Sequence, residues 1–286
     1  MRLTGLFRSL RLAAAVALMA ASGCAVTVDH ADVFSLRERQ LSVETVALPD
    51  GFERGRVQAL DLESDGRRFM GYRVMAPEPT RVVLFFPGNG YGASSALSGL
   101  VRLFSDQHTE LWILSYGQLG EAPPKVGQMY AMARELAAKA VSTARLPPER
   151  VIAVGHSLGG WPALHLAATR RVGCVVIAGT GTDVQAVAAA LLPKPVSMVV
   201  SLKPSDDVLL LDNLAQARKV VVPTLVLGSR ADTMMPERFS QAIFENLGNK
   251  PASRLLLSPT ASHAGYFRDA EITGAISAFI REKCGA

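Results

Sequence analysis

Continuous apolar runs alternate with longer amphipathic segments after about residue 80. The apolar runs fall at 82–86, 111–114, 151–154, 175–178, 220–227 and 255–257. Apolar positions recur with a helical period between them, most clearly at 126–144, 158–169, 236–247 and 270–283. Strands without alternation are buried on both faces, and helices between them predict the crossovers of a parallel sheet. The predicted fold class is therefore α/β, with a mostly parallel central sheet flanked by helices.

The segment before residue 80 has a different pattern. Residues 41–48, 57–62 and 69–75 show partial alternation, and the turn sequences Pro49-Asp50-Gly51 and Ser64-Asp65-Gly66 separate them. This pattern predicts antiparallel strands at the N-terminal edge of the sheet. We expect one α/β domain over residues 41–286, preceded by a polar linker at 24–40.

Residues 180–218 interrupt the regular alternation of strand and helix. This stretch is longer than a simple crossover and contains three prolines and the adjacent acids Asp206 and Asp207. It is a candidate cap insertion over the carboxyl edge of the sheet, where ligands of open α/β sheets bind. A long crossover with an additional surface helix explains the same pattern.

The first 23 residues are typical of an export signal. Arg2, Arg8 and Arg11 precede an apolar run over 12–21, which is about half the ~20 residues that a membrane-spanning helix needs. The sequence Ala21-Ser22-Gly23-Cys24 then resembles the lipobox of bacterial lipoproteins, in which the cysteine is acylated, for example with palmitate. The resemblance implies a cell-envelope protein that is anchored by lipid at Cys24. The expected location is the outer membrane, with the protein facing the periplasm.

The charge of the chain depends on this signal. With 30 Lys and Arg against 25 Asp and Glu the formal net charge is +5, but it falls to +2 without the three N-terminal arginines. The remaining domain is nearly neutral, so composition does not favour nucleic acid as a partner. The expected partners are a small-molecule acyl substrate and, through the anchor, the membrane.

The cysteine content excludes a disulfide scaffold, because the chain has only three cysteines. Besides Cys24 these are Cys174 and Cys284, which an oxidising compartment would allow to pair. Cys174 lies in an apolar run, where a buried thiol that behaves as a small hydrophobic side chain is the favoured interpretation. The sequence leaves both states open.

A nucleophile motif follows the predicted strand that ends at residue 154. Gly155-His156-Ser157-Leu158-Gly159 has the pattern G-x-S-x-G between a strand and a helix, which is the context of a nucleophile elbow. The turn holds Ser157 in a strained backbone conformation, and the two glycines let strand and helix pass closely. Ser157 is the candidate nucleophile.

A serine nucleophile needs a base, and His263 is the best placed of the five histidines. It follows the last predicted strand, at the carboxyl end of the sheet, where its loop can reach Ser157. Asp232, after the strand at 220–227, is the candidate carboxylate that orients the imidazole. Asp183 is a rival, since it follows the preceding strand.

The oxyanion of an acyl-transfer reaction needs backbone donors. The N–H of Leu158 is one candidate, and the N–H of Asn89, in the glycine-rich loop 86–90, is the second. Together these residues resemble the α/β-hydrolase superfamily over roughly residues 80–283. The resemblance implies a serine hydrolase that forms an acyl-enzyme and uses neither a cofactor nor a metal ion.

The resemblance does not identify the substrate. Pro87 replaces the histidine that many relatives carry in the oxyanion loop, and Ser115-Tyr116-Gly117-Gln118-Leu119-Gly120 replaces their Asp-x-Arg-Gly-x-Gly. A carboxylic ester or thioester is the expected substrate, because apolar residues of the candidate cap would line the pocket. Amide or peptide hydrolysis and acyl transfer use the same machinery and remain alternatives.

Two other classes of protein share parts of this pattern: dinucleotide-binding oxidoreductases and non-catalytic lipoproteins. Residues 88–93 match G-x-G-x-x-A, the dinucleotide fingerprint, but no carboxylate ends the next strand to bind a ribose. A non-catalytic envelope lipoprotein could keep the fold as a binding module. That class predicts a degraded site, whereas this sequence retains each member of the candidate triad.

Overall fold

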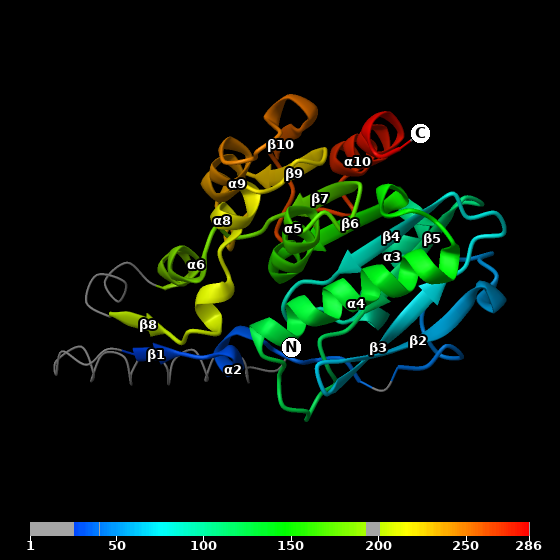
Figure 1. The fold of residues 1–286 in the computed structure, drawn as a ribbon, viewed down its shortest axis with the longest axis horizontal. Helices are drawn as coiled ribbons and strands as arrows, with labels where there is room; N and C mark the ends of the chain where they lie inside the picture. Colours follow the sequence, from blue (N-terminus) through cyan, green and yellow to red (C-terminus); the bar gives the residue numbers. More distant parts are fainter. Residues whose placement is uncertain (1–25, 40, 193–200, 286) are drawn as a thin grey trace.

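The computed structural model describes residues 26–39, 41–192 and 201–285. An eight-stranded sheet with strand order β10-β9-β7-β6-β4-β5-β3-β2 forms the centre of the molecule (Figure 1). The strands β4, β5, β6, β7, β9 and β10 are parallel, whereas β3 runs antiparallel to both β2 and β5. The predicted fold class, with its antiparallel N-terminal edge, is therefore confirmed. The strands are β2 Val57–Ser64, β3 Arg67–Val74, β4 Arg81–Phe86, β5 Thr109–Leu114, β6 Val151–His156, β7 Cys174–Ala178, β9 Thr224–Ser229 and β10 Arg254–Ser258.

Helices cover both faces of the sheet. Alternate residues of β4 face opposite layers: Val82, Leu84 and Phe86 pack with α4, α5, α8 and α9, whereas Val83 and Phe85 pack with α3 and α10. Burial on both sides explains why these strands lack polar alternation. The helices are α3 Ala93–Phe104, α4 Val126–Ala144, α5 Gly160–Ala168, α8 Asn213–Ala217, α9 Glu237–Glu245 and α10 Ala270–Lys283, and short 3₁₀ turns lie at Arg54–Arg56, Pro148–Arg150 and Lys250–Ala252.

The N-terminal segment is folded rather than a linker. Residues 26–39, here called the N-terminal strap, contain β1 Val26–Val28 and α2 His30–Val33. Phe34 is buried and makes an edge-on contact with Tyr116, with ring centroids 5.6 Å apart. Residues 41–48, in contrast, form turns and not the predicted strand, although Val46 is buried.

The candidate cap at 180–218 contains secondary structure of its own. Its elements are α6 Val184–Leu191, β8 Leu202–Pro204, the 3₁₀ turn η4 Val208–Leu210 and helix α8. Strand β8 pairs in parallel with β1 in a separate two-stranded sheet. The strap and the insertion therefore join each other, and Figure 1 shows them side by side beyond the end of the main sheet.

The two thiols that the sequence left open form a disulfide bond. Cys174, at the first position of β7, is bonded to Cys284, the residue after α10. The expectation of a free buried thiol at Cys174 is corrected. Both cysteines are buried, so Cys174 packs in the apolar core, as its sequence context predicts, and forms the disulfide as well. The signal peptide at 1–23 and Cys24 lie outside the described residues.

Candidate active site

Ser157 lies at a sharp turn between β6 and α5. Its φ angle is +52°, in the left-handed region that residues with a side chain rarely adopt. A Cβ atom on Gly155 would lie 2.2 Å from the carbonyl oxygen of Gly159, and one on Gly159 would lie 1.9 Å from the carbonyl oxygen of Phe86. Both positions require glycine, so the predicted close passage of strand and helix is confirmed.

The structure brings His263 and Asp232 together. Nδ1 of the imidazole lies 2.8 Å from Oδ2 of the carboxylate. Oδ1 accepts hydrogen bonds from the backbone N–H groups of Met234, at 2.9 Å, and Met235, at 2.8 Å. Burial raises the pKa of Asp232, but the hydrogen bonds from His263 and Met235 outweigh it and hold the pKa below its usual value. The carboxylate is therefore ionised at neutral pH and fixes the tautomer with a proton on Nδ1, which leaves Nε2 free to accept one.

Tyr266 and His156 support this pair, although neither was a candidate for this role in the sequence analysis. The buried Tyr266 hydroxyl donates to Oδ2 of Asp232 at 3.1 Å. Burial and the Asp232 charge raise the pKa of Tyr266, so the phenol stays protonated. Nε2 of His156 lies 2.8 Å from the carbonyl oxygen of His263 and donates to it. The location of Tyr266 in the same loop as His263 is the only sequence signal for its contribution.

Ser157 and His263 line one cavity. Ser157 is 6% exposed and His263 is half-buried. No hydrogen bond joins Ser157 Oγ to the imidazole in the part of the chain that the structure describes. Such bonds are often long in proteins without substrate and shorten when the substrate binds.

Asp183, the rival carboxylate, has a structural role. Its side chain caps helix α6 by accepting the N–H of Ala186 at 2.8 Å and also accepts the hydroxyl of Thr182 at 3.0 Å. These bonds occupy the carboxylate at the start of the insertion. The carboxylate at the imidazole is that of Asp232.

The glycine-rich loop 86–90, which carries the predicted oxyanion donor Asn89, is held from two sides. Oδ1 of Asn89 accepts the backbone N–H of Ser35 in the N-terminal strap, at 2.5 Å. The buried Tyr116 hydroxyl donates to the carbonyl oxygen of Pro87 at 3.0 Å, so the two positions that depart from the usual family motifs contact each other. A Cβ on Gly88 would lie 3.2 Å from Cβ of Ser157, which places this loop directly against the elbow.

Comparison with known proteins agrees with this architecture. A model of the alpha/beta hydrolase family matches residues 83–212. An esterase of Pyrococcus furiosus superposes with a TM-score of 0.65 at 13% identity, over 91% of this chain and 98% of its own. The chain has the α/β-hydrolase fold.

Other solved structures with this hydrolase fold have different activities in their names. An acetyl xylan esterase from Paenibacillus sp. R4 matches with a TM-score of 0.64 at 13% identity, over 89% of this chain and 98% of its own. A Mycobacterium tuberculosis puromycin-hydrolysing peptidase matches with a TM-score of 0.65 at 21% identity, over 80% of this chain and 39% of its own. No curated protein matches the sequence. At these identities the structural likeness shows the fold alone.

A cavity of about 610 Å³ lies over the elbow of the hydrolase fold. Its walls are mostly apolar and come from five regions: the strap, the glycine-rich loop with α3, the elbow with the start of α5, the insertion with helix α6, and the loops after β9 and β10. Val33, Trp161, Val187, Leu191 and Met235 contribute apolar surface. Such a cavity suits an acyl chain or another apolar group.

The dinucleotide alternative is not supported, because the N-terminus of α3 is already occupied. The carboxylate of Glu38 accepts the N–H of Ser94 in the first turn of this helix, at 3.0 Å. Glu38 is buried, and a Cβ on Gly92 would lie 2.1 Å from its Oε2. A pyrophosphate would have to bind at this helix N-terminus, where the strap already places a negative charge.

The described part of the chain offers neither a membrane-spanning helix nor a metal cluster. No helix within it is both long and apolar enough to cross a bilayer. It likewise contains no group of three or more His, Cys, Asp or Glu side chains arranged to bind a metal ion.

Proposed function

We propose that this protein is a serine hydrolase that cleaves a carboxylic ester or thioester through an acyl-enzyme. The observation that carries the proposal is one apolar cavity that contains both Ser157, in a strained elbow, and His263, oriented by Asp232. Esterases and a peptidase share the fold, which supports hydrolysis as the reaction class.

The reaction begins when Ser157 Oγ attacks the acyl carbonyl carbon and His263 Nε2 takes the hydroxyl proton. Asp232 stabilises the imidazolium, and the N–H groups of Leu158 and Asn89 bind the oxyanion. Collapse of this intermediate breaks the bond to the alcohol or thiol, which leaves with the proton from His263. Water then attacks the acyl-enzyme with His263 as base, and the carboxylic acid is released.

Covalent labelling tests the proposed nucleophile. A fluorophosphonate probe should label the wild-type protein and leave Ser157→Ala unmarked, because the probe reacts with an activated serine. Ser35→Ala, which alters another serine that lines the cavity, is the matched control and should be labelled by the probe as wild type is. Equal labelling of wild type and Ser157→Ala would refute the assignment. Absence of labelling in both would favour the non-catalytic binding module.

The bond that is cleaved is tested with a substrate panel. Nitrophenyl esters of increasing chain length should be hydrolysed faster than amino-acid amides, because the cavity walls are mostly apolar. A preference for the amides would instead indicate a peptidase. Transfer of the acyl group to an added alcohol in place of water would indicate an acyltransferase.

We further propose that Cys24 carries a lipid that anchors the protein in the cell envelope, on the outer membrane facing the periplasm. The arginines and small residues around the apolar run support this proposal. The Cys174–Cys284 disulfide is in keeping with an oxidising compartment outside the cytosol. Cys24→Ser should abolish incorporation of labelled palmitate and release the protein from membranes. Membrane retention of a correctly processed Cys24→Ser protein would contradict the anchor.

A further inference from the structure

Two arginine side chains line the mostly apolar cavity. Arg37 belongs to the N-terminal strap, and Arg268 belongs to the loop that carries His263. Both side chains are exposed, which places their charges where the cavity meets solvent. The cationic groups therefore lie on two separate elements that meet at the same opening.

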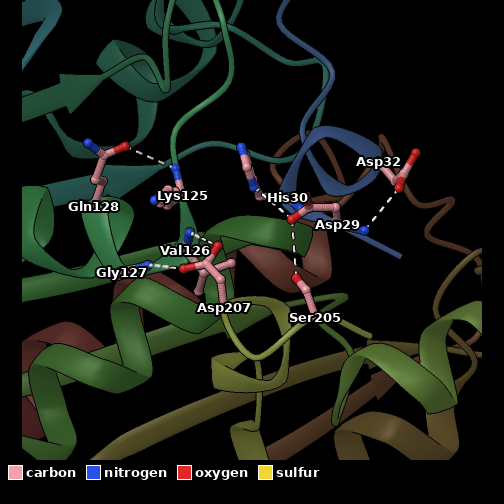
Figure 2. Close-up of polar contacts among 9 residues, drawn as sticks. All are labelled: Asp29, His30, Asp32, Lys125, Val126, Gly127, Gln128, Ser205 and Asp207. Atoms are coloured by element: carbon pink, nitrogen blue, oxygen red, sulfur yellow. Dashed lines mark hydrogen bonds and ion pairs between the residues drawn. The ribbon is translucent and has the colours of Figure 1, made fainter. Parts of the chain in front are cut away.

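Neither guanidinium is used for an internal contact. Among the described residues, Arg37 and Arg268 form no ion pair and donate no side-chain hydrogen bond, whereas Arg73 pairs with Glu110. Asp32 is the one carboxylate among the described residues of the lining, and it accepts the N–H of Asp29 at 2.9 Å in the capping box of α2 (Figure 2). The charged side chains of the lining are thus two arginines and one aspartate, which leaves an excess of one positive charge and both guanidinium groups free of ion pairs among the described residues.

The position of Arg37 connects this charge with the proposed reaction centre. Its Nε lies 3.4 Å from where a Cβ on Gly90 would be, and Gly90 directly follows Asn89. Arg268 follows His263 by five residues, and its backbone N–H donates to the carbonyl oxygen of Gly265 in the same loop at 2.8 Å. One arginine is therefore on the oxyanion side of the cavity and the other is on the histidine side.

We propose that Arg37 and Arg268 form a binding site for an anionic group on the substrate, a carboxylate or a phosphate, in the leaving alcohol or thiol. The acyl chain occupies the apolar walls, and the charged leaving group lies at the rim. The guanidinium is suited to this role because its planar N–H donors match both carboxylate and phosphate. This inference rests on the proposed hydrolase function and extends it to amphiphilic, negatively charged esters or thioesters.

A pair of chromogenic esters tests the site. The hexanoate esters of 4-nitrophenol and of 5-hydroxy-2-nitrobenzoic acid share the acyl chain and differ by one carboxylate on the leaving group. We expect wild type to favour the anionic ester by kcat/KM. Arg37→Gln and Arg268→Gln should each lower the ratio of anionic to neutral kcat/KM about three- to tenfold, as expected for a partly solvated charged contact.

Arg39→Gln is the matched control, since Arg39 is an exposed arginine of the same strap that does not line this cavity. Its ratio should equal that of wild type. An unchanged ratio in both cavity variants would overturn the inference. Ser157→Ala distinguishes this failure from failure of the proposed function: its inactivity on both esters supports the nucleophile, and its full activity refutes that assignment.

Binding without turnover provides an independent readout. By calorimetry, the wild-type protein should bind octyl phosphate more tightly than octanol. The double variant Arg37→Gln/Arg268→Gln should lose this difference, whereas Arg39→Gln should keep it. Equal affinity of the wild type for the two compounds would also overturn the inference, because the arginines would then contribute nothing to recognition.

Discussion

Asn89 is the residue at which the N-terminal strap meets the proposed reaction. Its side chain is held by the N–H of Ser35, and its own N–H is the proposed second oxyanion donor. Asn89→Ala keeps the backbone donor but removes the hydrogen bond that holds the loop. We therefore expect kcat to fall about tenfold, with a smaller change in KM. This loss of kcat is smaller than the loss expected when an oxyanion donor itself is removed.

The partner of this hydrogen bond provides the control. Ser35→Pro removes the N–H, and the extended Phe34, with ψ of 126°, tolerates a following proline. Ser35→Pro should reduce kcat as Asn89→Ala does, and the double variant should be no worse than either single variant. Ser35→Ala keeps the N–H and should retain most of kcat. Additive losses would show that the two residues act separately.

His156 makes the stability of the fold depend on pH. Burial and the neighbouring His263 lower the pKa of His156 to about 4 from 6.5. The unfolded chain therefore takes up a proton at higher pH than the folded protein does. The free energy of unfolding should fall as the pH drops from about 6.5 to 4, with about 3 kcal/mol from this group.

Urea denaturation at pH 7 and pH 4.5 measures this effect. His156→Gln keeps a donor for the carbonyl oxygen of His263 but does not titrate. Its stability should decline less than that of wild type over this range. The pKa of His165 is also lowered to about 4, by burial and then by Arg134, but this histidine is common to both proteins. Parallel pH profiles would contradict the assignment to His156.

Local motifs predicted only part of the site. Ser157 and Leu158 belong to one short motif, and chain order selected Asp232 and His263, which the structure places in hydrogen-bond contact. Ser35 and Tyr116 contact the glycine-rich loop and Glu38 contacts the first turn of α3, and these hydrogen bonds join residues 29 to 56 positions apart. No local pattern encodes such contacts, because they depend on how the strap and the segment after β5 pack against the loop and α3.

At the scale of elements, Asp207 joins the insertion to the main helix layer. Its carboxylate accepts the N–H groups of Val126, at 2.8 Å, and Gly127, at 3.1 Å, at the start of α4 (Figure 2). Asp207→Ala should lower the free energy of unfolding by about 1 to 2 kcal/mol, because it removes a charged cap from a helix N-terminus. Chemical denaturation measures this loss.

Asp206 is the adjacent control, since it is exposed and makes no hydrogen bond or ion pair among the described residues. Asp206→Ala changes the net charge equally and should leave stability within about 0.5 kcal/mol of wild type. Equal destabilisation by both substitutions would indicate a general charge effect rather than a cap.

Elements were predictable where the pattern was long and buried. Helix α4 has the predicted bounds, and the apolar runs correspond to the strands of the parallel sheet. The three-residue strands β1 and β8 carry no such signal, because they are too short for a period and depend on pairing with each other across the sequence. Residues 41–48 show the reverse case, because their partial alternation predicts a strand, but no strand pairs with them and they form turns.

For the whole molecule, the Cys174–Cys284 disulfide is the longest covalent constraint, closing a loop with a sequence separation of 110 residues. In the chain-entropy account a loop of this size contributes about 4 to 5 kcal/mol by restricting the unfolded chain. The sequence did not predict the bond, because an apolar run favours a buried thiol and does not show which distant segment packs against it. The structure pairs them because α10 ends against the start of β7.

Cys174→Ala/Cys284→Ala should therefore lower the free energy of unfolding by about 4 kcal/mol in urea denaturation. Dithiothreitol should destabilise wild type comparably and leave the double variant unchanged, which separates the covalent effect from lost packing. Cys174 begins β7, whereas Ser157 follows the end of the neighbouring parallel strand β6, so the disulfide and the nucleophile lie at opposite edges of the sheet. Esterase activity of the double variant at low temperature should therefore persist. Loss of activity in a folded double variant would show that the two edges are coupled through the strands.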